Sequence, residues 1–122
     1  MGRWKFYKKK FLENISKSSN ILLISGSENE INILREMGFS NLNVTYHDKN
    51  DEIILKKLGF ELNINLFKCD IRSLQFENKS YEYVVTNATL HHVDQPHKSI
   101  TEMYRVASKG VLIIESNDSL TM

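Results

Sequence analysis

The feature that most constrains this chain is a repeated alternation of short, largely apolar runs with segments of helical periodicity. The apolar runs occupy residues 21–24, 42–46, 64–69, 83–86 and 111–114. Runs of this length, rich in β-branched side chains, are typical of strands that are buried on both faces. The alternation predicts an α/β fold in which a parallel, Rossmann-like sheet of about five strands carries helices on both faces.

Helix signals fill the intervals between these runs. Ser27, followed three residues later by Glu30, predicts a capping box at the start of one helix, and Gly38 predicts its end. Asn50 is expected to cap the next helix, which we predict to close at Gly59. Each strand is therefore expected to lead into a helix through a short loop.

Two further helices are predicted near the ends of the chain. Pro96 is expected to open a helix that runs to about residue 108. Near the start, apolar side chains recur at helical spacing with lysines between them, at Trp4, Tyr7, Phe11 and Ile15. This pattern predicts a helix that covers the core, with a membrane-surface or nucleic-acid contact as the alternative. We expect one domain over residues 1–122, made of this helix (1–19), a core (20–115) and a tail (116–122).

Composition narrows the class of protein. With 41% hydrophobic and 25% charged residues the chain is too apolar for a disordered protein. The net charge of +1 gives no overall argument for nucleic acid or for a membrane surface as a partner, and we do not expect nucleic acid. The apolar runs are all shorter than the roughly 20 residues of a membrane span, so none is predicted. Cys69 is the single cysteine, so an internal disulfide is impossible and a cytoplasmic location is favoured.

Candidate ligand-binding residues follow the predicted strands. Open parallel sheets bind ligands beyond the carboxyl ends of their strands, near the point where the strand order reverses. Asp48 follows the second run, and its carboxylate could accept both hydroxyls of a ribose or could cap the next helix. Asp70 follows the third run and has the same two interpretations, and with the backbone of Ile71 it could hold an adenine.

The second half of the chain carries a recognisable pattern. Residues 70–115 read DIRSLQFENKSYEYVVTNATLHHVDQPHKSITEMYRVASKGVLIIE. This stretch resembles the class I S-adenosylmethionine-dependent methyltransferases, in which an acidic residue is followed by a Leu-Pro-Phe turn, an acid, Ser-Phe-Asp, a valine-rich strand and Leu-His-His. The corresponding positions here are Leu74, Gln75, Phe76, Glu77, Ser80, Tyr81, Glu82, Val84, Val85, Leu90, His91 and His92. The resemblance continues through Glu102, Arg105 and Val106 and covers most of residues 20–115.

This resemblance implies S-adenosylmethionine as the cofactor and an unidentified small molecule as the methyl acceptor. Its cofactor-binding positions fall on Ser25, Gly26 and Ser27 for the methionine part, Asp48 and Lys49 for the ribose, Asp70 and Ile71 for the adenine, and Asn87, Ala88 and Leu90 near the reactive methyl group. His91 and His92 are candidates for a general base, with a packing or capping role as the alternative. No metal site is expected, because the histidines and Cys69 lack the spacing of a ligand motif.

The chain also departs from the family pattern. Leu23 stands where an acidic residue is usual, and Ser25, Ser27 and Asn29 stand where glycines are usual. A Cβ at such positions could cost on the order of 1–3 kcal/mol in strain or lost approach to the cofactor. Two carboxylates at the following helix start, at Glu28 and Glu30, are expected to compete with a cofactor carboxylate.

These departures leave a second function open. It is a catalytically inactive scaffold or partner-binding subunit that keeps the sheet but has lost the cofactor. The sequence also contains no counterpart of the family's C-terminal antiparallel strands, so the fifth strand is expected to be a sheet edge. We expect either that a second copy of the chain or another partner covers that edge, or that the sequence is a fragment of a longer protein.

Overall fold

The computed structural model describes residues 3–47, 49–87 and 93–114. In these ranges the elements are α1 (Arg3–Asn14), β1 (Ile21–Ile24), α2 (Glu28–Glu36), β2 (Leu42–Tyr46), α3 (Lys49–Leu62), β3 (Asn65–Lys68), β4 (Tyr81–Asn87), α4 (Pro96–Val106) and β5 (Ala107–Ile114). The five strands that they contain form one sheet in the order β3-β2-β1-β4-β5, with every pair parallel. The predicted α/β fold is therefore confirmed. None of the described helices has the length and apolar character needed to cross a bilayer.

The sheet order places the topological switch point at β1. β1 pairs with β2 on one side and with β4 on the other, so the chain builds outward in one direction through β3 and then returns to build outward in the other. In the register, Leu23 lies beside Val44 of β2 and beside Val85 of β4. The carboxyl end of β1 is therefore where such a fold binds its ligand.

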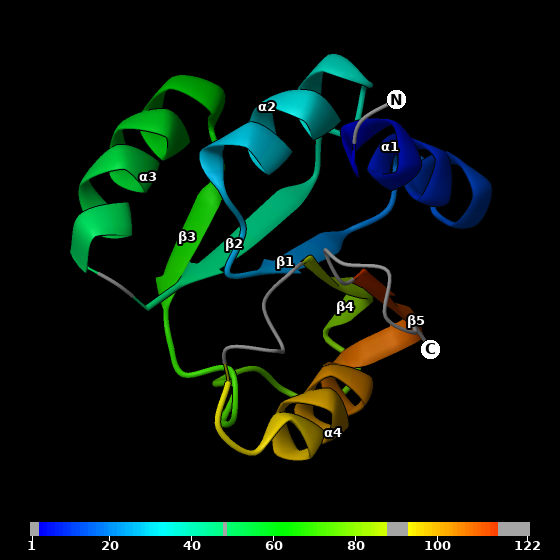
Figure 1. Ribbon diagram of the computed structural model, residues 1–122, viewed down its shortest axis with the longest axis vertical. Helices are drawn as coiled ribbons and strands as arrows, with labels where there is room; N and C mark the ends of the chain where they lie inside the picture. Colours follow the sequence, from blue (N-terminus) through cyan, green and yellow to red (C-terminus); the bar gives the residue numbers. More distant parts are fainter. Residues whose placement is uncertain (1–2, 48, 88–92, 115–122) are drawn as a thin grey trace.

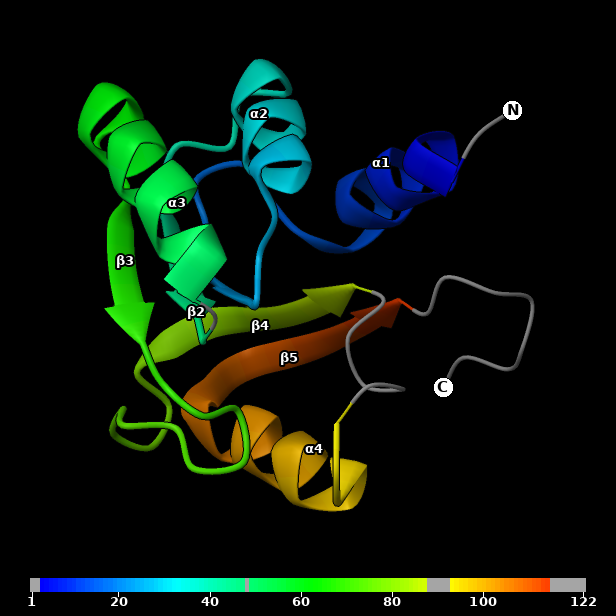
Figure 2. The same ribbon diagram turned by 60° about the vertical axis from the view of Figure 1, so that its left-hand side comes forward.

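The helices divide between the two faces of the sheet. Figures 1 and 2 show α1, α2 and α3 on one face and α4 on the other. Alternate side chains of β1 follow this division: Ile21 and Leu23 join the core cluster under α1–α3, whereas Leu22 and Ile24 join the cluster under α4. Because both faces are covered, all four residues of β1 are buried, which explains the uninterrupted apolar run.

The predicted boundaries of α2 are correct, whereas those predicted for α3 are not. Ser27 caps α2 through the predicted capping box, and Gly38 adopts a φ of +100° after it. By contrast, α3 already begins at Lys49 and continues through Gly59 to Leu62, so Asn50 is not its cap. A Cβ at Gly59 would lie 2.9 Å from Cδ1 of Leu66. This glycine therefore permits close packing of α3 on β3 and does not end the helix.

The last helix and strand also differ from expectation. α4 ends at Val106, two residues earlier than predicted, and β5 begins at the next residue. β5 pairs with β4 from Ala107 opposite Tyr81 to Ile114 opposite Asn87, with an irregular register between Tyr81 and Tyr83. Pairing along this whole length makes both strands longer than their apolar runs.

The α1 helix packs on the core, as predicted for a covering helix. Tyr7, Phe11 and Ile15 are buried in the cluster beneath α1–α3. The ring of Phe11 contacts that of Phe39, with the centroids 5.4 Å apart and the planes nearly perpendicular. Edge-to-face contacts of this kind add to the apolar burial that fixes α1 on the sheet.

We predict that Phe11→Ala lowers the free energy of unfolding by about 3–5 kcal/mol, because it leaves a cavity in this cluster. Phe60→Ala is the matched control, since the Phe60 side chain is 91% exposed and its loss should change stability by no more than about 0.5 kcal/mol. Urea unfolding followed by circular dichroism measures both. Equal destabilisation by the two substitutions would show that α1 does not contribute to the core.

Candidate functional site

A cavity of about 280 Å³ opens at the carboxyl ends of the strands beside the switch point. Its walls come from the ends of β1, β2 and β3 and from the segment before α4, through Ser25, His47, Asp70, Ile71, Arg72, Val93 and Asp94. The sequence predicted three of these residues, Ser25, Asp70 and Ile71, and the structure brings them together around one space. It did not predict the other four.

Asp70 is held by Arg72, which lies two residues further along the chain. The Arg72 side chain donates to both carboxylate oxygens, from Nε to Oδ1 at 3.1 Å and from Nη2 to Oδ2 at 2.9 Å. The Arg72 backbone N–H also donates to Oδ1 at 2.8 Å. A carboxylate offers about four acceptor positions, so these three bonds leave room for one further donor. On its other side, Nη1 of Arg72 approaches Oδ2 of Asp94 at 3.9 Å.

This contact fixes the charge of the cavity wall. The Arg72 side chain, its backbone N–H and its positive charge together lower the pKa of Asp70 from 3.8 to about 2. Asp70 is therefore ionised throughout the physiological range. Arg72 carries the compensating positive charge, and its own pKa is raised by the same hydrogen bonds. A signal for Arg72 was present in the sequence, as a basic residue within reach of an acidic one.

The loop between β1 and α2 combines a strained residue with a required glycine. Ser25 adopts a φ of +52°, a left-handed conformation that glycine adopts more readily, and its N–H donates to Oγ1 of Thr45 at 2.9 Å. Gly26 is buried, and a Cβ there would lie 3.0 Å from Cγ1 of Val44 and 3.1 Å from Cβ of Leu23. The loop thus retains its tight turn although serine occupies position 25, where the family usually has a glycine.

The two carboxylates at the start of α2 have different environments. Glu30 is buried, and its Oε1 accepts the Ser27 N–H while its Oε2 accepts the Tyr7 hydroxyl at 2.7 Å. Burial, followed by the charge and hydrogen bond of Glu30, raises the pKa of Tyr7 well above its usual value. Glu28 is exposed and lines a smaller cavity of about 130 Å³ together with Gly26. Neither carboxylate lines the larger cavity.

The other residues predicted to bind the cofactor lie on different elements. Ser27 is the N-cap of α2 and lines the smaller cavity, Lys49 is exposed in the first turn of α3, and Asn87 is buried at the end of β4. Lys49 and Asn87 line neither of these two cavities. Asp48, Ala88, Leu90, His91 and His92 lie outside the described residues.

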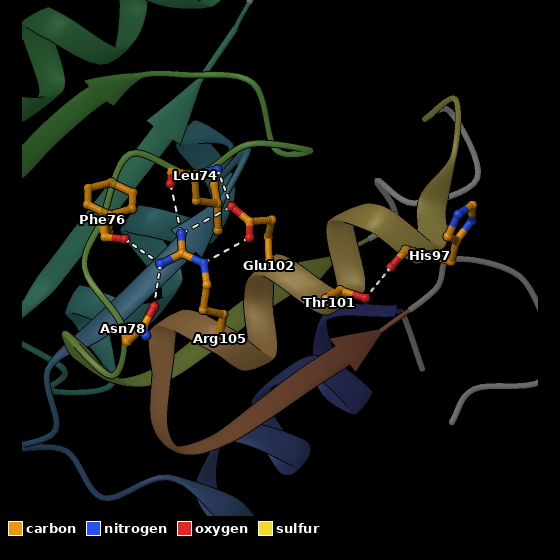
Figure 3. Close-up of polar contacts among 7 residues, drawn as sticks. All are labelled: Leu74, Phe76, Asn78, His97, Thr101, Glu102 and Arg105. Atoms are coloured by element: carbon orange, nitrogen blue, oxygen red, sulfur yellow. Dashed lines mark hydrogen bonds and ion pairs between the residues drawn. The ribbon is translucent and has the colours of Figure 1, made fainter.

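Two residues of α4 anchor the loop that contains Asp70. Arg105 donates from Nη2 to the Leu74 carbonyl at 2.9 Å and from Nη1 to the Phe76 carbonyl at 2.8 Å, as Figure 3 shows. Oε1 of Glu102 accepts the Leu74 N–H at 2.8 Å, and Oε2 accepts Nε of Arg105 at 2.8 Å. The planar guanidinium thus ties two backbone carbonyls of the loop to α4. The sequence pattern included both residues but did not reveal this role.

The sequence profile of a known family matches most of the chain. The family is described as a methyltransferase domain, and the match covers residues 23–114. The chain belongs to this methyltransferase domain family. Its sheet and helices also have the arrangement of class I S-adenosylmethionine-dependent methyltransferases, which confirms the family resemblance seen in the sequence.

Solved structures support the same fold for this methyltransferase domain. One is a provisionally assigned S-adenosyl-L-methionine-dependent methyltransferase from Methanococcus maripaludis, with a TM-score of 0.76, 15% identity and coverage of 88% of this chain and 52% of that one. Another comes from a complex of the Haloferax volcanii Trm112 methyltransferase activator with a provisionally assigned methyltransferase (TM-score 0.71, 14% identity, 85% and 47% coverage). A third is the [4+2]-cyclase SpnF (TM-score 0.74, 14% identity, 84% and 40% coverage).

These comparisons establish the fold but not the reaction. The chain spans about half the length of these solved structures. One of them is named as a cyclase, so the fold by itself does not specify one reaction. No curated protein matches the sequence.

We predict that Arg72→Ala raises the pKa of Asp70 from about 2 toward its usual 3.8, because it removes the guanidinium that favours the carboxylate. Carboxyl-carbon NMR titration of the folded protein between pH 2 and about 6 measures the change. In the wild type, the stabilisation from ionised Asp70 is present above about pH 3.8 and is lost as the pH falls toward 2. An unchanged midpoint in Arg72→Ala would show that the pair does not form in solution.

Proposed function

We propose that this methyltransferase domain binds S-adenosylmethionine in the cavity beside Ser25 and Asp70 and transfers its methyl group to a small molecule. The supporting observation is that the cavity lies at the switch point with neither Glu28 nor Glu30 among its walls. A cleft filled by one of these side chains would have favoured loss of the cofactor.

The residues present have the chemistry that the cofactor needs. In this proposal Asp70 accepts the exocyclic amine of the adenine at its remaining acceptor position, and the backbone of Ile71 contacts the ring edge. Arg72 keeps the Asp70 carboxylate charged and oriented. Arg72 also borders the cavity, and in this proposal its planar guanidinium packs against the adenine ring.

The neighbouring loops complete the proposed site. Ser25 and Gly26 form a close turn against β2, and backbone N–H groups at the start of α2 face the methionine part of the cofactor. Asp48 and Lys49 contribute the ribose contact. Asn87, Ala88 and Leu90 border the reactive methyl group in this proposal, and His91 or His92 takes a proton from the acceptor where the chemistry needs one.

For methyl transfer, the main requirement on the protein is that it aligns the methyl donor with the acceptor. The cofactor, when bound, supplies a reactive sulfonium methyl donor. The role of the chain is then to hold donor and acceptor at the distance and angle of attack and to exclude water. A site without a dedicated base is therefore compatible with this activity.

Two observations favour the alternative of an inactive scaffold. Leu23 is completely buried in the core at a position where the family usually has an acidic residue. Ser25 carries a positive φ that a glycine would adopt without strain. Both changes weaken the expected hold on the cofactor, so the alternative depends on whether binding survives them.

Calorimetric titration with S-adenosylmethionine and S-adenosylhomocysteine tests the proposal. We expect micromolar binding that is lost in Asp48→Ala and weakened roughly tenfold to a hundredfold in Asp70→Asn, since each substitution removes a charged acceptor. Glu77→Gln is the control, because Glu77 is exposed and does not line the cavity. Absence of heat and of a thermal shift at millimolar ligand would refute cofactor binding by this chain and favour the scaffold.

We also propose that a partner covers the outer edge of β5. In the described part of the chain β5 pairs only with β4, and Val111, Leu112 and Ile113 are half-buried. The stretch from Val111 to Ile114 contains no charged residue and no proline, and an apolar edge of this kind is a template for further pairing. The Haloferax volcanii structure, which includes a methyltransferase activator, gives a precedent for a partner of this fold.

Light scattering after size-exclusion chromatography tests whether that partner is a second copy. We expect twice the mass of a single chain, and we expect Leu112→Lys to restore the single-chain mass by placing a charge at the edge. Lys109→Ala, at the solvent-exposed start of the same strand, is the control. A single-chain mass at high concentration would exclude the second copy.

A further inference from the structure

Positive charge is concentrated in α1. Residues 3–14 contain five of the 16 basic residues of the chain and one of its 15 acidic residues, so this segment has a net charge of +4. The remaining chain, with 11 basic and 14 acidic residues, has a net charge of −3. The net charge of the whole chain is therefore close to zero although α1 is strongly basic and the rest of the domain is mildly acidic.

The lysines of α1 lie on the side of the helix that faces solvent. Tyr7 and Phe11 are buried on the sheet side of α1, and the Tyr7 hydroxyl bonds to buried Glu30 at the start of α2. The opposite side exposes lysines at positions 5, 8 and 9. Figure 1 shows α1 beside α2 at one end of the helical layer. The basic face is therefore preformed and rigidly mounted, so that binding through it requires little ordering.

Two apolar side chains lie on the exposed part of the same helix. Phe6 is 47% exposed and Leu12 is 57% exposed. The ammonium group of Lys10 lies 5.3 Å from the centre of the Phe6 ring, and Glu13 approaches Lys9 and Lys10 at 4.0 and 3.7 Å. The acidic residue at this end thus compensates only part of the local charge.

We propose that the exposed face of α1 binds the surface of an anionic lipid membrane. Clusters of four to eight basic residues on a helix are attracted to anionic headgroups. Exposed Phe6 and Leu12 can enter the boundary between headgroups and acyl chains, as the apolar residues of interfacial helices do. The same two side chains favour lipid over nucleic acid, because a phosphate backbone offers no apolar layer to receive them. This proposal does not depend on cofactor binding.

Co-sedimentation with vesicles tests the proposal on the full chain. The probes are vesicles of phosphatidylcholine alone and of phosphatidylcholine with about one-third phosphatidylserine, at low and at physiological ionic strength. We expect binding only to the mixed vesicles, weakening as salt increases. Each lysine should contribute about fivefold, so Lys5→Gln/Lys8→Gln/Lys9→Gln should weaken binding on the order of a hundredfold.

A matched variant separates the helix from the overall charge. Lys57→Gln/Lys68→Gln/Lys79→Gln removes the same charge from exposed positions outside α1 and should leave binding nearly unchanged. Phe6→Gln/Leu12→Gln should weaken binding to mixed vesicles while it leaves the salt dependence in place. Circular dichroism of each variant verifies that the fold is intact.

Three outcomes would overturn the proposal. One is no binding of the folded wild type to mixed vesicles at low salt. Another is an equal loss of binding in the two lysine variants, which would indicate attraction by net charge alone. The third is tighter binding to duplex DNA or to single-stranded RNA than to vesicles, with no effect of Phe6→Gln/Leu12→Gln, which would assign the face to nucleic acid.

Discussion

The structure depends on β1 being buried on both faces and paired on both edges. The strand pairs with β2 on one edge and with β4 on the other, and its side chains enter the two core clusters alternately. Because the strand order reverses at β1, its carboxyl end cannot be covered by a crossover on both sides. The cavity beside Ser25 follows from this arrangement, and so does the need for a tight loop into α2.

Charged side chains, rather than regular secondary structure, hold the loops around that cavity. Arg72 fixes Asp70 from within the same loop, and Arg105 with Glu102 fixes the following backbone from α4. These hydrogen bonds satisfy carbonyl groups that have no strand or helix to pair with. These bonds hold the cavity wall in place on the side proposed for adenine.

The sequence match and the fold show the family, whereas the proposed chemistry depends on one loop. The match over residues 23–114 and the strand order establish a methyltransferase domain. Catalysis depends on whether the altered first loop, with Leu23 and Ser25, still accepts the cofactor. The basic face of α1 is independent of that question, since it lies on a helix whose buried side packs on the core. The domain can thus carry a surface function whether or not it transfers a methyl group.

The sequence by itself determined the strands, the alternation and the capping box, because burial on two faces and local capping each leave a periodic or short-range signal. It also placed Ser25, Asp70 and Ile71 at strand ends, which the structure brings to one cavity. Only the tertiary structure decided the role of Gly59, which packs against Leu66 instead of ending a helix. Only the tertiary structure shows that Arg105 binds a loop about 30 residues earlier in the chain and that Tyr7 donates a hydrogen bond to Glu30. Such contacts depend on distances between segments far apart in the chain, and no local pattern encodes them.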